Sequence, residues 1–235
     1  MTALDALERE VTHCRRCARL VERRERVARE KRAAYADWDY WGRPVPGFGD
    51  PAARLLVLGL APAAHGANRT GRFFTGDRSG DFLFGALHRT GYANRPRSES
   101  ADDDFALSDA FITAAVRCAP PDNRPLPAER AACAEWLHAE VPLLERVRVV
   151  LCLGAIAWSA GLKLRAALGA PPPRPQPRFG HGVELDGSRF ALLGSYHPSQ
   201  QNTFTGRLVP AMLDDVLNRA RELSRAAPAS SPPAR

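Results

Sequence analysis

The stretch that decides the fold is "RLLVLGL" at residues 54–60, which runs into "APAAHGANRTGRFFTGD" at residues 61–77. A short apolar run bounded by turn residues is typical of a strand that is buried on both faces of a sheet. The loop after it is long and rich in small residues, with Gly59 and Leu60 at its start. It contains neither a Walker phosphate-binding motif nor a dinucleotide-binding glycine pattern. The stretch therefore predicts a buried strand followed by a long loop with exposed backbone amides.

Three more apolar runs alternate with helical patterns along the chain. Because strands that alternate with helices form parallel sheets covered on both faces, we expect an α/β fold. The predicted architecture is a three-layer α/β/α sandwich around a mainly parallel four-stranded sheet. Its ligand site should lie at the carboxyl ends of the strands. Further strands are expected at residues 111–116, 146–153 and 190–195, and helices within 2–36 and at 82–90, 128–141, 155–167 and 208–226.

Length and composition limit the class of protein. The chain has 235 residues, a formal net charge of +7 and a pI of about 9.6, which fits one domain at residues 1–226 followed by a disordered tail at 227–235. Only Lys31 and Lys163 are lysines, so arginine supplies the positive charge, and its planar donors suit phosphate. No apolar stretch approaches the roughly 20 residues that span a bilayer, and the N-terminus lacks signal-peptide features. We expect a cytoplasmic protein that does not enter a membrane.

Four of the five cysteines form a candidate metal site. Cys14 and Cys17 have C-x2-C spacing, and Cys118 and Cys133 follow about a hundred residues later, whereas Cys152 lies inside a predicted buried strand. Disulfides are not expected in the cytosol. Four thiolates complete either a zinc site or an iron–sulfur cluster. The spacing alone leaves zinc, iron–sulfur and four unrelated buried thiols open.

Two predicted loops carry candidate pocket residues. Adjacent Phe73 and Phe74 cannot both point into a core from one face, so one of them should line a pocket. Asp77 precedes a predicted helix, where an aspartate is commonly an N-cap. Asn123 follows the second strand, where it can form a turn or contact a base edge.

The last predicted strand ends in "GSYHPSQQN" at residues 194–202. A histidine that precedes a proline at the end of a strand has little backbone freedom. A lone histidine is more often structural, but His197 lies where α/β enzymes place their chemistry. The small polar residues and the arginine after it suit contacts with phosphate. The candidates for those contacts are Ser199, Gln200, Asn202 and Arg207.

Together these residues resemble the uracil-DNA glycosylase superfamily. Residues 59–77 look like its first motif, "HPSQQNTFTGRL" at 197–208 looks like its last, and the four cysteines resemble the iron–sulfur set of its bacterial and archaeal branches. The similarity covers nearly the whole chain and is greatest to the type B, or family five, branch. Residues 61–65 contain no carboxylate, and Asn123 is the first asparagine after the second strand, as in that branch. These two features differ from better-known members of the superfamily, and both imply a roomier pocket than in those members.

The resemblance implies a DNA repair glycosylase. Such an enzyme flips a deaminated base, uracil or also hypoxanthine, out of DNA and hydrolyses its N-glycosidic bond, leaving an abasic site. His197 is then expected to stabilise the departing base anion and Asp77 to hold the attacking water. Phe74 would stack on the base, with Asn123, Gly59 and Leu60 as further substrate contacts. A side chain within 200–208 should fill the gap left in the DNA.

The implied cofactor is an iron–sulfur cluster of the four-iron, four-sulfur type, in preference to zinc, on the four cysteines. The implied partner is DNA that contains deaminated bases, bound by a monomer. Two alternatives remain open: a module that binds damaged or single-stranded DNA without glycosylase activity, and a zinc-containing α/β hydrolase of small nucleotides. Abasic product would exclude the first, and salt-dependent DNA affinity would exclude the second.

Overall fold

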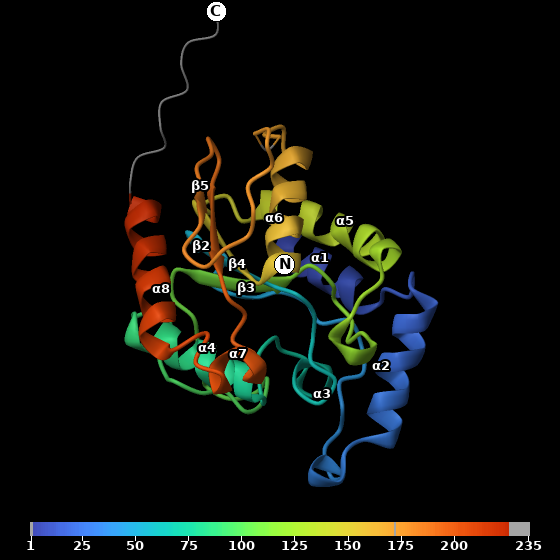
Figure 1. The fold of residues 1–235 in the computed structure, drawn as a ribbon. Helices are drawn as coiled ribbons and strands as arrows, with labels where there is room; N and C mark the ends of the chain where they lie inside the picture. The colour runs from blue at the N-terminus through green and yellow to red at the C-terminus, as the bar shows by residue number, and fades with distance from the viewer. Residues whose placement is uncertain (1, 172, 226–235) are drawn as a thin grey trace, which may run out of the picture.

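The computed structural model describes residues 2–171 and 173–225, so the predicted tail at 227–235 lies outside the described residues. A sheet with the strand order β1-β3-β2-β4-β6-β5 forms the middle layer, and helices cover both of its faces (Figure 1). In the described residues, no helix is long and apolar enough to cross a membrane.

Four parallel strands form the centre of the sheet, as predicted. Every residue in them is buried, which is why the sequence shows them as continuous apolar runs. Gly59 pairs with Ala114, and Leu153 pairs with Ser195. The strands therefore end at one edge of the sheet. They are β2 (Leu55–Gly59), β3 (Ala110–Ala114), β4 (Val149–Leu153) and β6 (Ala191–Ser195).

The sheet is wider than the predicted four strands. β1 (Phe48–Gly49) pairs antiparallel with β3, and β5 (Glu184–Leu185) pairs antiparallel with β6. Each of these edge strands has two residues, too few for an alternating pattern to be visible in the sequence. The observed sheet is thus six-stranded and mixed, with a parallel centre.

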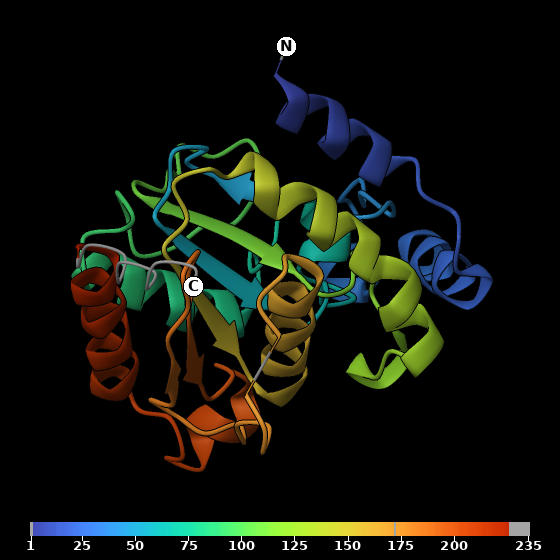
Figure 2. The same ribbon diagram turned by 90° about the horizontal axis from the view of Figure 1, so that it is seen from above.

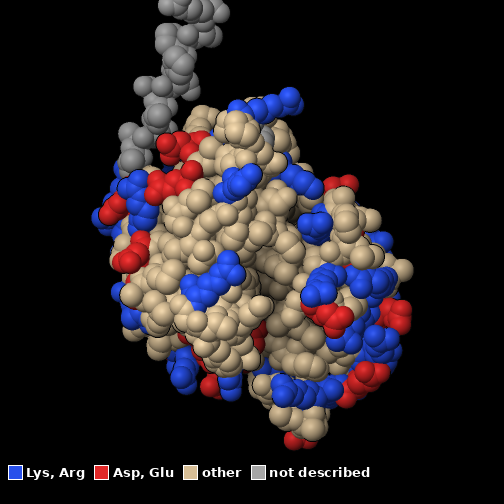
Figure 3. Space-filling view, in the orientation of Figure 1, with Lys and Arg blue, Asp and Glu red and all other residues tan. Residues whose placement is uncertain are grey.

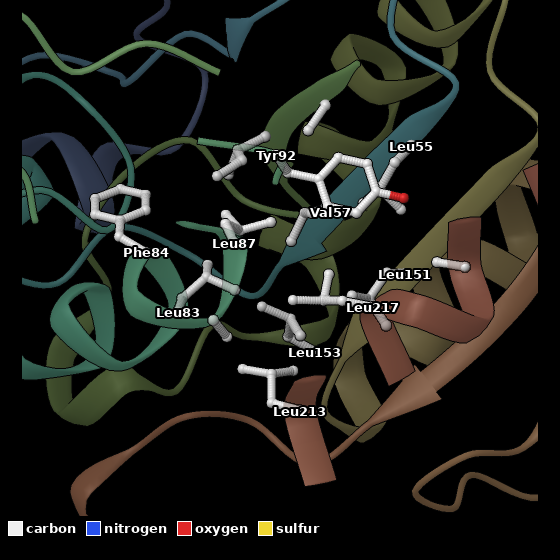
Figure 4. Close-up of a cluster of buried hydrophobic side chains, with 14 of the residues drawn as sticks. Leu55, Val57, Leu83, Phe84, Leu87, Tyr92, Leu151, Leu153, Leu213 and Leu217 are labelled. Atoms are coloured by element: carbon white, nitrogen blue, oxygen red, sulfur yellow. The ribbon is translucent and has the colours of Figure 1, made fainter. Parts of the chain in front are cut away.

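Two sets of helices cover the two faces (Figure 2). α4 (Arg78–Arg89) and α8 (Pro210–Arg225) pack on one face, where Leu83 and Leu213 meet Val57 of the sheet (Figure 4). α1 (Ala3–Thr12), α5 (Pro127–Leu143) and α6 (Ala155–Ala167) lie on the other. This is the predicted three-layer arrangement.

The predicted helical region at residues 2–36 is interrupted in the structure. α1 ends before the first cysteine pair, and α2 (Ala18–Glu30) begins directly after Cys17. Among the described residues, four short helices lie outside the long ones, one directly after α2 and three in the loops that follow β2, β3 and β6. They are η1 (Ala33–Tyr35), α3 (Ala67–Thr70), η2 (Pro121–Asn123) and α7 (Gln200–Phe204).

Candidate active site

A cavity of about 400 Å³ lies at the carboxyl ends of β2, β3 and β6. The molecular surface is hollowed between the side that carries α4 and α7 and the side that carries α2 (Figure 3). The cavity brings together residues from three post-strand loops that are far apart in the sequence. Its lining includes Phe73 and seven of the ten residues predicted to act on substrate or DNA: Gly59, Leu60, Phe74, Asp77, Asn123, His197 and Ser199.

The adjacent phenylalanines point to different environments. Phe73 is buried in the core, and the half-buried Phe74 lies over the start of the first loop. A Cβ on Gly59 would be 3.3 Å from the ring of Phe74, so the glycine allows the ring to lie close to the backbone. Phe74 has a φ of 59°, an uncommon conformation for a bulky residue, of the kind that is often found at functional sites.

The carbonyl of Phe74 is held against the first turn of α4. A Cβ on Gly80 would overlap the carbonyl oxygen of Phe74, so a residue without a side chain is required there. The unusual backbone conformation of Phe74 is therefore determined by its contact with α4.

His197 shares the cavity with Phe74. The centroids of the two rings are 6.1 Å apart, and their planes are inclined by 33°. Burial lowers the pKa of His197 from 6.5 to about 4, so the imidazole is neutral at physiological pH. No described residue hydrogen-bonds to its ring nitrogens, which leaves them to a bound molecule.

Asp77 combines the N-cap position of α4 with a place in the cavity lining. It is the N-cap of α4, and its Oδ1 accepts a hydrogen bond of 2.9 Å from the amide of Gly80. The carboxylate also lines the cavity, with Oδ2 against Gly66. Burial raises the pKa of Asp77 more than its hydrogen bonds to the amides of Gly80 and Ser79 lower it.

Asn123 also combines a turn with a place in the cavity. It is exposed and has a φ of 55°, directly after Asp122 with a φ of 52°. Asparagine and aspartate tolerate this left-handed conformation better than other residues with a side chain. The turn directs this loop over the cavity, where Asp122 and Arg124 join the lining.

The predicted phosphate contacts take several positions around α7. Ser199 is the N-cap residue of α7 and lines the cavity, whereas Gln200 is exposed and Gln201 reaches the lining. The side chain of Asn202 points inward and donates a hydrogen bond of 2.8 Å to the carbonyl of His197. A contact between Asn202 and DNA stays a prediction.

Two large exposed side chains lie on this loop. The guanidinium carbon of Arg207 is 4.5 Å from the ring centroid of Tyr196. Phe204, the last residue of α7, is 69% exposed, and the guanidinium of Arg78 lies 5.6 Å from its ring centroid. Phe204 is thus the most exposed of the large apolar side chains in the described residues, and it lies on the helix whose Gln201 lines the cavity.

The four predicted metal ligands lie around a second, smaller cavity. Cys14 and Cys17 from the α1–α2 connection face Cys118, which follows β3, and Cys133 on α5. In residues 2–171 and 173–225, no group of three or more His, Cys, Asp and Glu side chains is arranged to hold a single metal ion. Cys152 is buried in β4, apart from this cluster, as predicted.

A buried arginine lies among the four cysteines. Arg24 is 2% exposed, and its Nη1 donates hydrogen bonds of 3.0 Å to Sγ of Cys118 and 3.1 Å to the carbonyl of Cys14. Its closest carboxylate, on Glu25, is 3.8 Å away. The amide of Arg117 donates to Sγ of Cys133 at 3.3 Å. Sγ of Cys118 and Sγ of Cys133 each accept a hydrogen bond in this way, although burial raises the pKa of both thiols.

The fold and this cavity define a class of α/β protein, and comparison with known proteins assigns the chain to a family. The chain belongs to the uracil-DNA glycosylase superfamily, whose family model matches residues 46–221. A protein of Mycobacterium tuberculosis named Type-5 uracil-DNA glycosylase is 56% identical over 216 residues, which cover 91% of this chain and 79% of that protein. A Type-5 uracil-DNA glycosylase of Thermus thermophilus is 50% identical over 220 residues, 94% of this chain and 98% of that protein. A Type-4 uracil-DNA glycosylase of Thermotoga maritima is 33% identical over 116 residues, which cover 49% of this chain and 52% of that protein.

Proposed function

We propose that this protein is a type-5 uracil-DNA glycosylase, which hydrolyses the N-glycosidic bond of uracil in DNA and leaves an abasic site. The observation that carries the proposal is the single cavity that Phe74, His197 and Asp77 share at the carboxyl ends of the strands. The identity to Type-5 relatives over nearly the whole chain supports the same reaction. Hypoxanthine is proposed as a second substrate because no carboxylate in residues 61–65 narrows the cavity.

The target nucleotide must leave the duplex before it can react. Flipping costs a few kcal/mol, least for a mispaired base. Phe74 recovers part of this cost by stacking on the base, a contact worth about 1–3 kcal/mol that tolerates different bases. Phe204 is exposed on α7 beside the cavity, and we assign it to the gap that the flipped base leaves in the stack. Ser199 and Arg207 would contact the flanking phosphates.

His197 would stabilise the base as it departs. The glycosidic bond breaks with negative charge developing on the base and positive charge on the sugar. A neutral imidazole with a lowered pKa can donate one N–H to the developing anion without carrying a charge of its own into the buried site. A preorganised donor of this kind accelerates a reaction about 10²–10³-fold.

Asp77 would hold the water that attacks the sugar. Its Oδ1 is fixed by the amide of Gly80, so the carboxylate has a defined orientation toward the cavity. Asn123, on the opposite loop, would contact the base edge. The attacking water would give its proton to the Asp77 carboxylate as the new C–O bond forms, and the base would leave as an anion with the electrons of the broken C–N bond.

We also propose that Cys14, Cys17, Cys118 and Cys133 hold an iron–sulfur cluster. The buried charge of Arg24 supports this assignment, because an anionic cluster would add to the compensation of a guanidinium whose nearest carboxylate, on Glu25, is 3.8 Å away. A single zinc ion needs its ligands within about 2.3 Å of one point, whereas the thiolates of a cluster bind different iron atoms and lie further apart. The cluster would supply structural cross-linking between the α1–α2 connection, β3 and α5. The monomeric state and the cytoplasmic location stay predictions.

One gel tests the reaction. Oligonucleotides that contain uracil, hypoxanthine or an unmodified base are incubated with the protein and treated with alkali. Cleavage at uracil supports the proposal, and binding without cleavage would show a DNA-binding module instead. Iron and acid-labile sulfide in the purified protein, lost together in Cys118→Ser, would support the cluster; zinc in their place would refute it.

A further inference from the structure

The backbone that carries His197 is fixed at three consecutive residues. The amide of Gly154 donates to the carbonyl of Ser195 at 2.8 Å. The amide of Tyr196 donates to Nδ1 of His181 at 3.2 Å. The side chain of Asn202 donates to the carbonyl of His197 at 2.8 Å. Of these three links, only the one through His181 contains a group that titrates near physiological pH.

His181 belongs to a segment that lies directly beside β6. The amide of Gly182 donates to the carbonyl of Gly194, and the amide of Gly194 donates to the carbonyl of Val183, both at 2.8 Å. A Cβ on Gly194 would overlap the carbonyl of Gly180, so the two segments are in contact. The imidazole of His181 also stacks on Tyr196, with ring centroids 5.1 Å apart and planes inclined by 34°.

We propose that His181 is a positioning residue, which fixes the strand end that bears His197 only while its Nδ1 is unprotonated. An imidazole that accepts a hydrogen bond at Nδ1 carries its proton on Nε2. Taking up a second proton turns Nδ1 into a donor that faces the amide of Tyr196. The two N–H groups then oppose each other, and the residue before His197 loses its anchor.

Several groups influence this equilibrium. Burial lowers the pKa of His181 below its usual 6.5, and the backbone of Met212 and the carboxylate of Asp215, both on α8, act in the opposite direction. From β6, the hydroxyl of Ser195 lies 3.4 Å from Nδ1. Arg207 lies over Tyr196. The net effect lowers the pKa of His181, so Nδ1 is unprotonated at neutral pH and takes up a proton only as the pH falls below the usual range of a histidine.

Two substitutions test this role, which rests on the proposed glycosylase function. His181→Asn places an acceptor oxygen near the position of Nδ1 but cannot titrate, whereas His181→Leu removes the acceptor. At pH 8 we expect single-turnover uracil excision by the Asn variant within a few-fold of the wild type and by the Leu variant about tenfold slower. In His181→Asn, the acid limb of the pH–rate profile should shift to lower pH, because only the titrations of Asp77 and His197 then shape that limb. An unshifted limb would refute the proposal.

A second measurement does not depend on activity. In the ¹⁵N-labelled protein, the amide resonance of Tyr196 should move with the titration of the His181 ring and should not move over that range in His181→Asn. A Tyr196 amide that is insensitive to pH in the wild type would overturn the positioning role even if excision is observed. Conversely, a titrating amide in a protein that does not excise uracil would refute the proposed function alone.

Discussion

The rings of Phe74 and His197 lie with centroids 6.1 Å apart over one cavity, although the two residues are 123 positions apart in the sequence. The aromatic ring and the neutral imidazole thus line the same cavity. A flat heteroaromatic ring that stacks on Phe74 would have its edge within reach of His197. The first prediction concerns this donor.

His197→Ala should slow single-turnover excision of uracil by about 100-fold, the effect of removing one preorganised donor. DNA affinity should change little, because phosphate contacts dominate it. Rapid-quench kinetics at pH 8 and a DNA titration at fixed salt measure the two quantities. Unchanged excision would exclude His197 from the chemistry.

Two substitutions separate the capping role of Asp77 from its proposed catalytic role. Asparagine is as good an N-cap as aspartate, so Asp77→Asn should keep the melting temperature while slowing excision by about 100-fold. Asp77→Ala should slow excision and also lower the free energy of unfolding by about 1 kcal/mol, because the N-cap is removed. Because burial raises the pKa of Asp77, a falling pH should protonate this carboxylate in the wild type at a higher pH than it would protonate an exposed aspartate. A fully active Asn variant would reduce Asp77 to a structural cap.

Two glycines of α4 form a matched pair. Gly80→Ala should displace Phe74, because the added Cβ overlaps the carbonyl of that residue. We expect weaker binding of uracil-containing DNA and a lower melting temperature. At Gly85 the nearest atom to an added Cβ is the flexible end of Arg89, at 3.3 Å, so Gly85→Ala should be neutral or stabilise the helix by up to about 1 kcal/mol. Equal effects of the two substitutions would contradict the proposed support of Phe74.

Glu8 on α1 should make stability depend on pH. Burial and the charge of Glu140 raise the pKa of Glu8 from 4.5 to about 7. The folded state therefore holds a proton that the unfolded state has lost, and the free energy of unfolding should fall as pH rises from 4.5 to about 7. Glu8→Gln should stabilise the protein by about 1–2 kcal/mol at pH 8, after discounting for a half-buried group, and hardly at pH 4. Denaturant unfolding at pH 8 and at pH 4 measures this difference in stability, and the same substitution at the exposed Glu10, Glu10→Gln, is the control.

The central strands and most helices could be predicted because each shows an unbroken apolar run or a helical period. The edge strands were missed because two residues carry no pattern. α7 was missed because polar residues after Pro198 resemble a loop. The sequence placed His197 and Phe74 at the rim of the sheet, but it could not show the inward turn of Asn202, which depends on one carbonyl brought near by folding. The contact between Arg24 and Cys118 was equally hidden, since 94 residues separate them.

If the cysteines hold the proposed cluster, the burial of Arg24 beside them would link oxidative damage to the lifetime of the protein. Peroxide that strips the cluster would leave the guanidinium in a dry interior with only the Glu25 carboxylate, 3.8 Å away, as counter-charge, and this loss would destabilise the native state by several kcal/mol. Proteases act on unfolded chains. A cell under oxidative stress would therefore lose repair capacity through degradation of the protein, with each surviving molecule still working at its normal rate.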